Sequence, residues 1–185
     1  METAWAVEED IAEVLLSADE IQRRVGELGR AISADYDGLE PRLIGILKGV
    51  TPFMADLLRA VSIPLSVDFM AISKYDPSLE TKSLVRLLKD LDLSITGKHV
   101  LLIEDIIDSG LTMKYILKNL RAREPASLKV CALFNKPARR LVDLPLHYVG
   151  FDLPDVFVVG YGLDYEQKYR NLPYLAALSE EIYRA

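Results

Sequence analysis

Two adjacent acids follow a run of branched apolar residues in the middle of the chain. Val100 to Ile103 has the composition and length of a strand covered on both faces, so Glu104 and Asp105 are expected at or just beyond its carboxyl end. Adjacent carboxylates are costly to bury there unless a cation or hydroxyl donors meet them. Open α/β sheets bind ligands at the carboxyl ends of their strands. This position therefore predicts a ligand site.

The residues that come next favour an anion as that ligand. They are Asp108, Ser109, Gly110, Leu111 and Thr112, and they are typical of a turn that leads into a helix starting near Leu111. Backbone N–H groups and the positive end of a helix dipole converge at such a turn, which can hold an anion. A simpler interpretation remains open, in which Asp108 or Ser109 is an ordinary N-cap and the preceding acids are a solvated strand end.

The composition excludes several classes of protein. The chain has 185 residues, half of them hydrophobic, and a formal net charge of -6. The acidic balance argues against sequence-independent nucleic-acid binding, which depends on Lys and Arg. No apolar run reaches the roughly 20 residues that span a bilayer, and no basic n-region precedes an apolar segment at the N-terminus, so we expect a cytoplasmic protein. The single Cys131 is expected to be a buried, inert thiol.

Alternating strand and helix patterns surround the acidic stretch and predict an α/β fold with a mostly parallel, doubly wound sheet. The capping box Ser17-Ala18-Asp19-Glu20 predicts a helix with an apolar stripe. Between two expected strands, the polar segment 73–83 predicts a long loop of the kind that often forms a lid. Strands are expected over 42–47, 65–72, 84–88, 100–103, 127–135, 146–151 and 156–159, and further helices over 53–61 and 111–123.

The string from Glu104 to Thr112 resembles the phosphoribosyl-diphosphate signature of the type I phosphoribosyltransferases. Further segments follow in the order seen in the hypoxanthine-guanine, or 6-oxopurine, branch of that family, so the resemblance covers nearly the whole chain. These segments are Leu47-Lys48-Gly49, the loop with Tyr75, Leu88-Lys89-Asp90-Leu91, Lys136-Pro137 and the string 157–165. The resemblance implies the type I phosphoribosyltransferase fold, with a mostly parallel twisted sheet flanked by helices and a small hood lobe formed from terminal segments.

This fold implies one domain over residues 1–185. Its core is expected over about 35–145, and its hood from the N-terminal segment and about 146–185. The implied reaction transfers the ribose 5-phosphate group from 5-phosphoribosyl 1-diphosphate to hypoxanthine or guanine and releases diphosphate, with IMP or GMP as the product. The expected partners are those two substrates and further copies of the chain in a homodimer or homotetramer, with neither a membrane nor a nucleic acid.

The resemblance assigns the acidic stretch to the sugar and its 5′-phosphate. Backbone N–H groups of the segment from Asp108 to Thr112, with the Ser109 and Thr112 hydroxyls, would hold the phosphate. Glu104 and Asp105 would accept hydrogen bonds from the ribose hydroxyls and anchor Mg²⁺, which prefers hard oxygen ligands. Asp108 would manage the purine N7 proton as general base or acid.

Diphosphate is assigned to residues elsewhere in the chain. Lys48, Gly49 and Arg170 would bind it, with a cis peptide bond before Lys48, although Arg170 alone could be a surface charge. Tyr75 would close over the diphosphate and exclude water. The chain departs from the family at this loop, where Ser-Tyr is usual, because Lys74 precedes the tyrosine. Lys74 could contact diphosphate or be a solvated loop residue.

The purine is assigned to four residues near the C-terminus. Lys136 would donate to the purine O6 and disfavour an amino group there, and Phe157 could stack on the ring. The Val158 backbone would read the base edge, and Asp164 would approach a second metal position, so that Glu104, Asp105 and Asp164 form the implied metal set. Without the family, Lys136 would be read as a solvated lysine and Phe157 as a core residue.

Two other functions are compatible with this pattern. An RNA-binding regulator of the same fold, catalytic or not, would need a basic concave face, which the acidic composition disfavours. An enzyme that prefers xanthine is also compatible, but Lys136 followed by Phe157 and Val158 favours hypoxanthine and guanine. His99 and His147 lack metal-ligand spacing with each other or with Cys131, and we expect structural roles for both.

Overall fold

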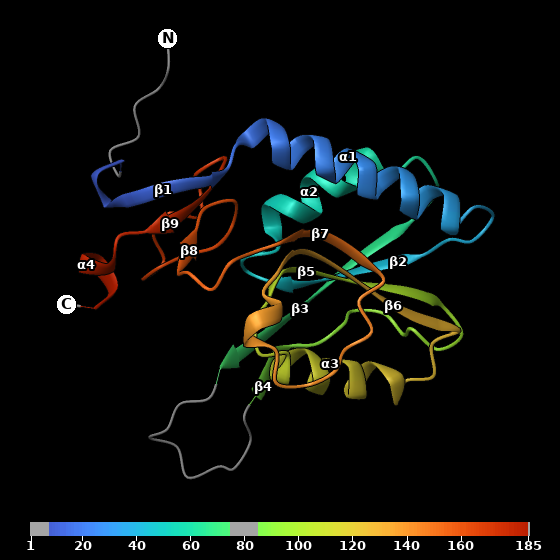
Figure 1. Cartoon of the computed structure of the whole chain (residues 1–185). Helices are drawn as coiled ribbons and strands as arrows, with labels where there is room; N and C mark the ends of the chain where they lie inside the picture. Colours follow the sequence, from blue (N-terminus) through green and yellow to red (C-terminus); the bar gives the residue numbers. More distant parts are fainter. Residues whose placement is uncertain (1–7, 75–84, 185) are drawn as a thin grey trace.

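The computed structural model describes residues 8–74 and 85–184, which form two sheets (Figure 1). The larger sheet has the strand order β4-β3-β2-β5-β6-β7, and the smaller has the order β1-β9-β8. All neighbours in the larger sheet are parallel except β3 and β4. Its strands are β2 (Arg42–Leu47), β3 (Ser66–Lys74), β4 (Val85–Lys89), β5 (His99–Ile107), β6 (Ser127–Asn135) and β7 (Tyr148–Asp152). The predicted mostly parallel sheet is confirmed.

Helices cover both faces of the larger sheet. In Figure 1, α1 (Ala18–Asp35) and α2 (Thr51–Ala60) lie above it and α3 (Leu111–Arg121) lies below. The capping box at Ser17 and Glu20 is present at the start of α1. The predicted apolar stripe of that helix, made of Ile21, Val25, Leu28 and Ile32, is buried.

The central strand β5 separates two hydrophobic cores. Leu101 and Ile103 pack in the cluster with α1 and α2, whereas Val100 and Leu102 pack in the cluster with α3. Side chains of a strand alternate between the two faces of a sheet, so a strand covered on both faces has an unbroken apolar sequence. The apolar run from Val100 to Ile103 is therefore explained by helices that cover β5 on both faces. Cys131 is fully buried in the first cluster, and burial raises the pKa of its thiol.

The smaller sheet joins the two ends of the chain and forms the predicted hood. Its strands β1 (Ile11–Leu16), β8 (Val158–Val159) and β9 (Leu175–Leu178) are antiparallel. Short helices complete the chain, namely η1 (Glu8–Asp10), η2 (Pro137–Arg139) and α4 (Glu180–Tyr183). The hood core contains Val159, Tyr169, Leu172 and Leu178. β9 and α4 were not predicted from the sequence.

One expected boundary of the hood is wrong. The segment 146–151 was assigned to the lobe, but the structure pairs β7 with β6, so the hood begins after Asp152. Without β7, the unpaired N–H and C=O groups of β6 would form an exposed edge. Arg24 of α1 binds this edge strand, because its guanidinium donates to the carbonyls of Val149 at 2.8 Å and Gly150 at 2.9 Å.

The two histidines form hydrogen bonds at the amino-terminal ends of the strands. Nδ1 of His99 lies 2.9 Å from the Ser127 hydroxyl, and Nδ1 of His147 accepts from the backbone N–H of Val130 at 3.1 Å. Burial lowers the pKa of His147. These contacts agree with the expected structural roles. Among the helices in residues 8–74 and 85–184, none has the length and apolar character to cross a bilayer.

Candidate active site

The acidic residues of β5 extend past one neighbouring strand but not the other. The ladder between β5 and β2 ends at the pair Ile103 and Gly45, whereas the ladder with β6 continues to Ile107. Glu104 and Asp105 therefore lie inside the strand, beyond the last residue that pairs with β2, and both are partly buried. The prediction that the strand ends before these two acids is therefore correct for the pairing with β2 but not for the pairing with β6.

Two glycines allow three segments to meet beside Asp105. A Cβ atom on Gly49 would lie 1.7 Å from Asp105 Oδ2, and a Cβ atom on Gly162 would lie 2.0 Å from the Gly49 carbonyl oxygen. Only glycine permits such contacts, and Gly162 also has a φ of +98°. The peptide bond between Leu47 and Lys48 is cis, as the resemblance implies. The turn after β2 is thus packed between β5 and the hood.

The loop between β5 and α3 ends in a helix N-terminus that has no side-chain cap. Gly110 is the N-cap residue, with a left-handed φ of 82°. The interpretation of Asp108 or Ser109 as the N-cap is therefore wrong, although the Ser109 hydroxyl lies 3.4 Å from the N–H of Leu111. The first-turn N–H groups of a helix have no intrahelical partner, so an anion can take the place of the cap.

Asp108 projects from this loop toward two arginines. Its carboxylate is half exposed and lies 3.4 Å from Nη1 of Arg139, which also forms an ion pair with Asp155. Its backbone carbonyl accepts from Nε of Arg140 at 3.1 Å. The carboxylate therefore has one long, exposed ion pair, which is weak and easily exchanged.

Lys136 is a buried cation rather than a solvated surface lysine. The residue is 4% exposed, and its ammonium donates to the Val156 carbonyl at 2.5 Å. Burial lowers the pKa of Lys136, while the nearby carboxylates of Asp108 and Asp155 oppose that shift. A buried ammonium needs acceptors, and this one points to the segment that leads into β8.

Phe157 has one aromatic neighbour stacked on it and another at its edge. Its ring centroid lies 4.9 Å from that of Tyr183 with an interplanar angle of 23°, and 5.7 Å from that of Tyr165 at 90°. Phe157 is partly buried beside the hood core, and Val158 is buried in β8, where it pairs with Ala177. Tyr183, in a helix that was not predicted, had no sequence signal to mark it.

Asp164, Arg170 and Lys48 are brought together through Gln167. Nη2 of Arg170 lies 2.7 Å from Oδ1 of Asp164, whose second oxygen accepts from the Gln167 backbone at 3.0 Å. Oε1 of Gln167 lies 3.4 Å from Nζ of Lys48 and 3.3 Å from Nη2 of Arg170. The two cations assigned to diphosphate thus share one acceptor. Sequence reasoning missed Gln167, which is an exposed polar residue without a motif of its own.

Other expected site residues are placed less completely. Tyr75 lies outside the described residues, and Lys74 ends β3. Within residues 8–74 and 85–184, no three His, Cys, Asp or Glu side chains gather closely enough to hold a metal. A metal at Glu104 and Asp105 would therefore need further oxygen ligands from substrate or water, as Mg²⁺ commonly has.

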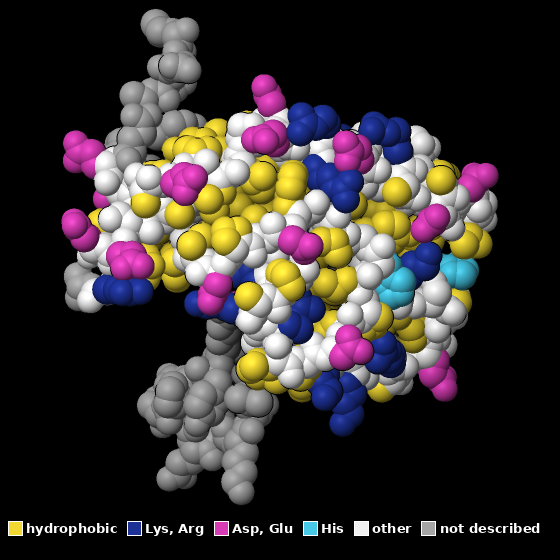
Figure 2. Space-filling view, viewed as in Figure 1, with side chains coloured by type: hydrophobic (Ala, Val, Ile, Leu, Met, Phe, Trp, Pro, Cys, Tyr) yellow, Lys and Arg dark blue, Asp and Glu magenta, His cyan; other side chains and the backbone are white. Residues whose placement is uncertain are grey.

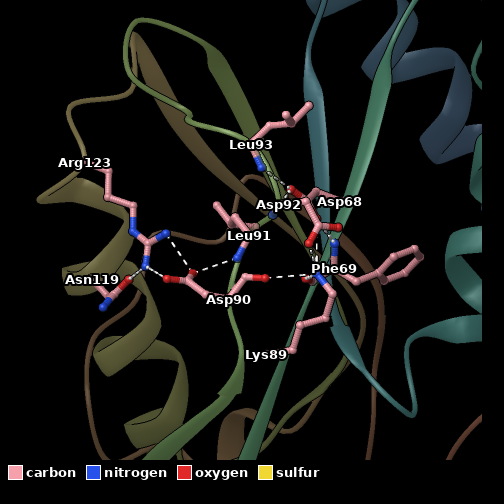
Figure 3. Close-up of polar contacts among 9 residues, drawn as sticks. All are labelled: Asp68, Phe69, Lys89, Asp90, Leu91, Asp92, Leu93, Asn119 and Arg123. Atoms are coloured by element: carbon pink, nitrogen blue, oxygen red, sulfur yellow. Dashed lines mark hydrogen bonds and ion pairs between the residues drawn. The ribbon is translucent and has the colours of Figure 1, made fainter.

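The family segment Leu88-Lys89-Asp90-Leu91 forms part of a polar network (Figure 3). Nζ of Lys89 donates to the Phe69 and Asp90 carbonyls and to Asp92 Oδ1, each at 3.0 Å. Buried Asp68 accepts from the Asp92 N–H at 2.9 Å.

The same network reaches the helix on the lower face of the sheet. Nη1 of Arg123, just after α3, lies 2.8 Å from Oδ1 of Asp90, and Nη2 donates to Asn119 at 2.7 Å (Figure 3). This part of the family pattern therefore joins β3, the connection from β4 to β5, and the C-terminal end of α3.

Comparisons with known proteins agree with this arrangement. A family model of the phosphoribosyl transferase domain matches residues 13–166. The hypoxanthine-guanine phosphoribosyltransferase of Bacillus subtilis (strain 168) is 47% identical over 176 residues, which cover 95% of this chain and 98% of that protein. That of Mycobacterium avium is 47% identical over 181 residues, which cover 95% of this chain and 89% of the relative.

A solved structure extends the similarity to the fold. The crystal structure of a hypoxanthine phosphoribosyltransferase from Staphylococcus aureus superposes with a TM-score of 0.93 at 44% identity, covering 98% of this chain and 99% of the other. Sequence, strand order and site residues all point the same way. The chain belongs to the hypoxanthine-guanine phosphoribosyltransferase family.

Proposed function

We propose that this enzyme transfers the 5-phosphoribosyl group of 5-phosphoribosyl 1-diphosphate to hypoxanthine and guanine, giving IMP and GMP in purine salvage. The observation that carries the proposal is the buried Lys136 ammonium, 2.5 Å from the Val156 carbonyl and next to the segment with Phe157 and Val158. A fixed cation donor favours a 6-oxo group over a 6-amino group, because adenine would present a donor to a donor. Family membership supplies the reaction.

On the sugar side, the N–H groups of the loop from Asp108 to Thr112 bind the 5′-phosphate at the N-terminus of α3. The Ser109 and Thr112 hydroxyls add donors. Asp108 exchanges its long ion pair with Arg139 for the purine N7 proton, which it holds or returns as the base is bonded to the sugar. This role needs an exposed carboxylate beside the phosphate loop.

Diphosphate binds between the turn after β2 and the hood. Lys48 and Arg170 exchange their shared contact with Gln167 for diphosphate oxygens, and the Gly49 backbone permits close approach. Tyr75, preceded by Lys74, closes the site and excludes water. These cations stabilise the charge that develops on the leaving group.

We assign the cofactor as Mg²⁺, held by Glu104 and Asp105, with Asp164 near a second position. The carboxylates are hard oxygen donors, and both lie partly buried on β5 beside the turn after β2. When bound, the ion neutralises charge on diphosphate. The protein residues orient the ribose hydroxyls toward Glu104 and Asp105.

On the purine side, Lys136 donates to O6, and the Val158 backbone reads the edge of the base. Phe157 stacks on the base with the ring face turned away from Tyr183, since the other face is occupied. These contacts favour hypoxanthine and guanine over xanthine, because none of the assigned residues donates a hydrogen bond to the additional oxygen of xanthine.

We further assign a homodimer or homotetramer in the cytoplasm, on the basis of the family resemblance. Light scattering coupled to gel filtration measures the mass, and a monomer at micromolar concentration would contradict this assignment. On the face drawn in Figure 2, Lys and Arg side chains are interspersed with Asp and Glu. This distribution favours small-molecule substrates over RNA as the partner.

A competition assay tests the proposed function. Purified enzyme with Mg²⁺ and 5-phosphoribosyl 1-diphosphate is offered hypoxanthine, guanine, xanthine and adenine together, and the four nucleotides are separated. IMP and GMP should dominate the products, and AMP should be absent. Failure to convert any 6-oxopurine, or a predominant yield of XMP, would contradict the proposal.

A further inference from the structure

A carboxylate on α2, which is not among the residues assigned to substrate, accepts hydrogen bonds from α1 and from the hood. Oδ2 of Asp56 accepts from Nε2 of Gln22 on α1 and from the hydroxyl of Tyr161 in the hood, each at 2.5 Å. The other oxygen pairs with Arg59. The Asp56 side chain is only 14% exposed. One acid therefore joins α1, α2 and the turn that follows β8.

The tyrosine that reaches this acid lies at the centre of the turn. Tyr161 is 4% exposed, lies between two glycines of positive φ, and itself has a φ of +45°. Its N–H donates to the Leu172 carbonyl at 2.9 Å. Burial and then the bond to Asp56 raise the pKa of its hydroxyl. These contacts favour the neutral hydroxyl, which donates to Asp56.

The residue after Tyr161 touches the parts of the site assigned to diphosphate. Gly162 presses on the Gly49 carbonyl, at the distance that excludes a Cβ atom. The Gly162 carbonyl accepts from Nη1 of Arg170 at 2.8 Å, and its N–H donates to the Arg170 carbonyl at 3.0 Å. A shift of Tyr161 by a few tenths of an ångström would therefore move both Arg170 and the wall beside Gly49.

We propose that Asp56 and Tyr161 are positioning residues for diphosphate binding, because their hydrogen bond fixes the hood turn against the turn after β2. The inference rests on the proposed function, which assigns Lys48, Gly49 and Arg170 to diphosphate. Neither residue touches the reacting atoms. The bond acts on the affinity for 5-phosphoribosyl 1-diphosphate and leaves purine recognition, at Lys136 and Phe157, nearly unchanged.

The substitution Tyr161→Phe tests this role because it removes one hydroxyl and keeps the buried ring. A matched control exists in Tyr148→Phe: Tyr148 is 8% exposed, its hydroxyl donates to Asp35 at 2.6 Å, and it is the first residue of β7, at the end of the strands opposite to the site. Both variants remove a tyrosine–carboxylate hydrogen bond. A purely structural role would lower the melting temperature in both and alter no substrate constant.

For Tyr161→Phe we expect KM and Kd for 5-phosphoribosyl 1-diphosphate, and KM for diphosphate in the reverse reaction, to rise about tenfold. KM for hypoxanthine should change less than about twofold, and Tyr148→Phe should leave all these constants within about twofold of wild type. Kd is measured by calorimetry without purine, so the readout does not depend on turnover.

A second variant keeps the test decisive. Asp56→Ala, which leaves the Tyr161 hydroxyl without this acceptor, should raise the same constants, and adding Tyr161→Phe to it should raise them no further, because the bond between the two residues is already lost. Equal constants for Tyr161→Phe and wild type, or a parallel rise in KM for hypoxanthine, would overturn the inference. If wild type itself neither bound 5-phosphoribosyl 1-diphosphate nor made IMP, the proposed function would fail instead.

Discussion

The two halves of the site are built in different ways. The ribose-phosphate half is one continuous segment, residues 104–112, which covers the start of α3 and the end of the central strand, where that strand pairs with β6 but no longer with β2. The purine and diphosphate half comes from segments far apart in sequence, which meet only through the hood. Lys136, Phe157 and Arg170 already have protein partners there, in the Val156 carbonyl, the Tyr183 ring and the Asp164 carboxylate.

This difference separates two ways of preparing a site for its ligand. The N–H groups at the N-terminus of α3 have a geometry fixed by the backbone, so an anion that binds there displaces one long contact, that of the Leu111 N–H with the Ser109 hydroxyl. In the hood half, ligand groups replace contacts that protein atoms already make, which lowers the net affinity per contact. We therefore expect substitutions in the first half to affect chemistry and those in the second half to affect selectivity and substrate constants.

The largest expected effect is on the ribose-phosphate half. Asp108→Asn should lower kcat by about 10²–10⁴-fold, because an amide cannot take the N7 proton, with the melting temperature unchanged. Steady-state kinetics and thermal unfolding measure the two. Asp155→Asn is the matched control, since both carboxylates are about half exposed and share Arg139. Equal losses in the two variants would show that the ion pair matters rather than proton transfer.

Lys136→Ala tests the purine half directly. The loss of a charged donor should lower kcat/KM for hypoxanthine by about 10–100-fold. The ratio of kcat/KM for hypoxanthine to that for adenine should fall as well. Lys129→Ala serves as the control, because Lys129 lies on β6, the strand that ends just before Lys136, and its ammonium lies over the rings of Tyr36 and Tyr148 instead. Unchanged selectivity among the four purines in Lys136→Ala would remove this residue from base recognition.

The contact between the halves is tested at Gly49. Gly49→Ala would place a Cβ atom 1.7 Å from the Asp105 carboxylate, so the turn after β2 must move. We expect KM for 5-phosphoribosyl 1-diphosphate to rise about tenfold, with a cost of about 1–3 kcal/mol in stability. Gly26→Ala on α1, where the nearest atom is 3.6 Å away, should leave KM unchanged and be neutral or stabilising. Wild-type constants for Gly49→Ala would refute the close packing.

A smaller effect is expected from Tyr183→Ala. Removal of the stacked ring frees one face of Phe157 and loosens it, so KM for hypoxanthine and guanine should rise about three- to tenfold. KM for 5-phosphoribosyl 1-diphosphate should stay the same, which the same kinetic assay measures. Tyr115→Ala, at an exposed tyrosine of α3, controls for the loss of an aromatic residue, and a matching change there would argue against the stack.

The smallest effect concerns pH and stability. Burial lowers the pKa of Lys136 below its ordinary 10.5, so between the folded pKa and 10.5 the unfolded chain binds more protons than the folded one. This group therefore makes the free energy of unfolding rise with pH in that window. The free energy of unfolding is measured by urea denaturation at several pH values between neutral and about pH 10. Plotted against pH, it should rise less steeply, or fall more steeply, for Lys136→Ala than for wild type. Parallel slopes would mean that the lysine is not desolvated.

The local parts of this molecule were predictable, and the parts set by distant contacts were not. An apolar run followed by acids and glycine identifies β5 and α3, since burial on both faces and helix-end geometry act within a few residues. By contrast, β7 joins the main sheet because β6 needs a partner along its edge. Gln167 and Tyr183 acquire their places only when the hood folds, so no spacing in the sequence marks either one.

Selectivity residues fall between these two cases. Lys136 was assigned through family resemblance, whereas its local sequence favoured a solvated side chain. Its burial is possible because the Val156 carbonyl, 20 positions later in the chain, accepts a hydrogen bond from its ammonium. Asp56 and Tyr161 are separated by 105 positions, and no property of either residue alone suggests that they form a hydrogen bond.

The arginine on α1 that binds the carbonyls of β7 has a consequence for how copies of this chain can associate. An open strand edge is a template on which another strand can add, in fibres as well as in functional complexes. Successive carbonyls of a strand point toward opposite edges, so one of the Val149 and Gly150 carbonyls, both hydrogen-bonded to Arg24, faces away from β6. A strand that added along β7 would therefore have to displace the guanidinium at that position, which disfavours extension of the sheet there.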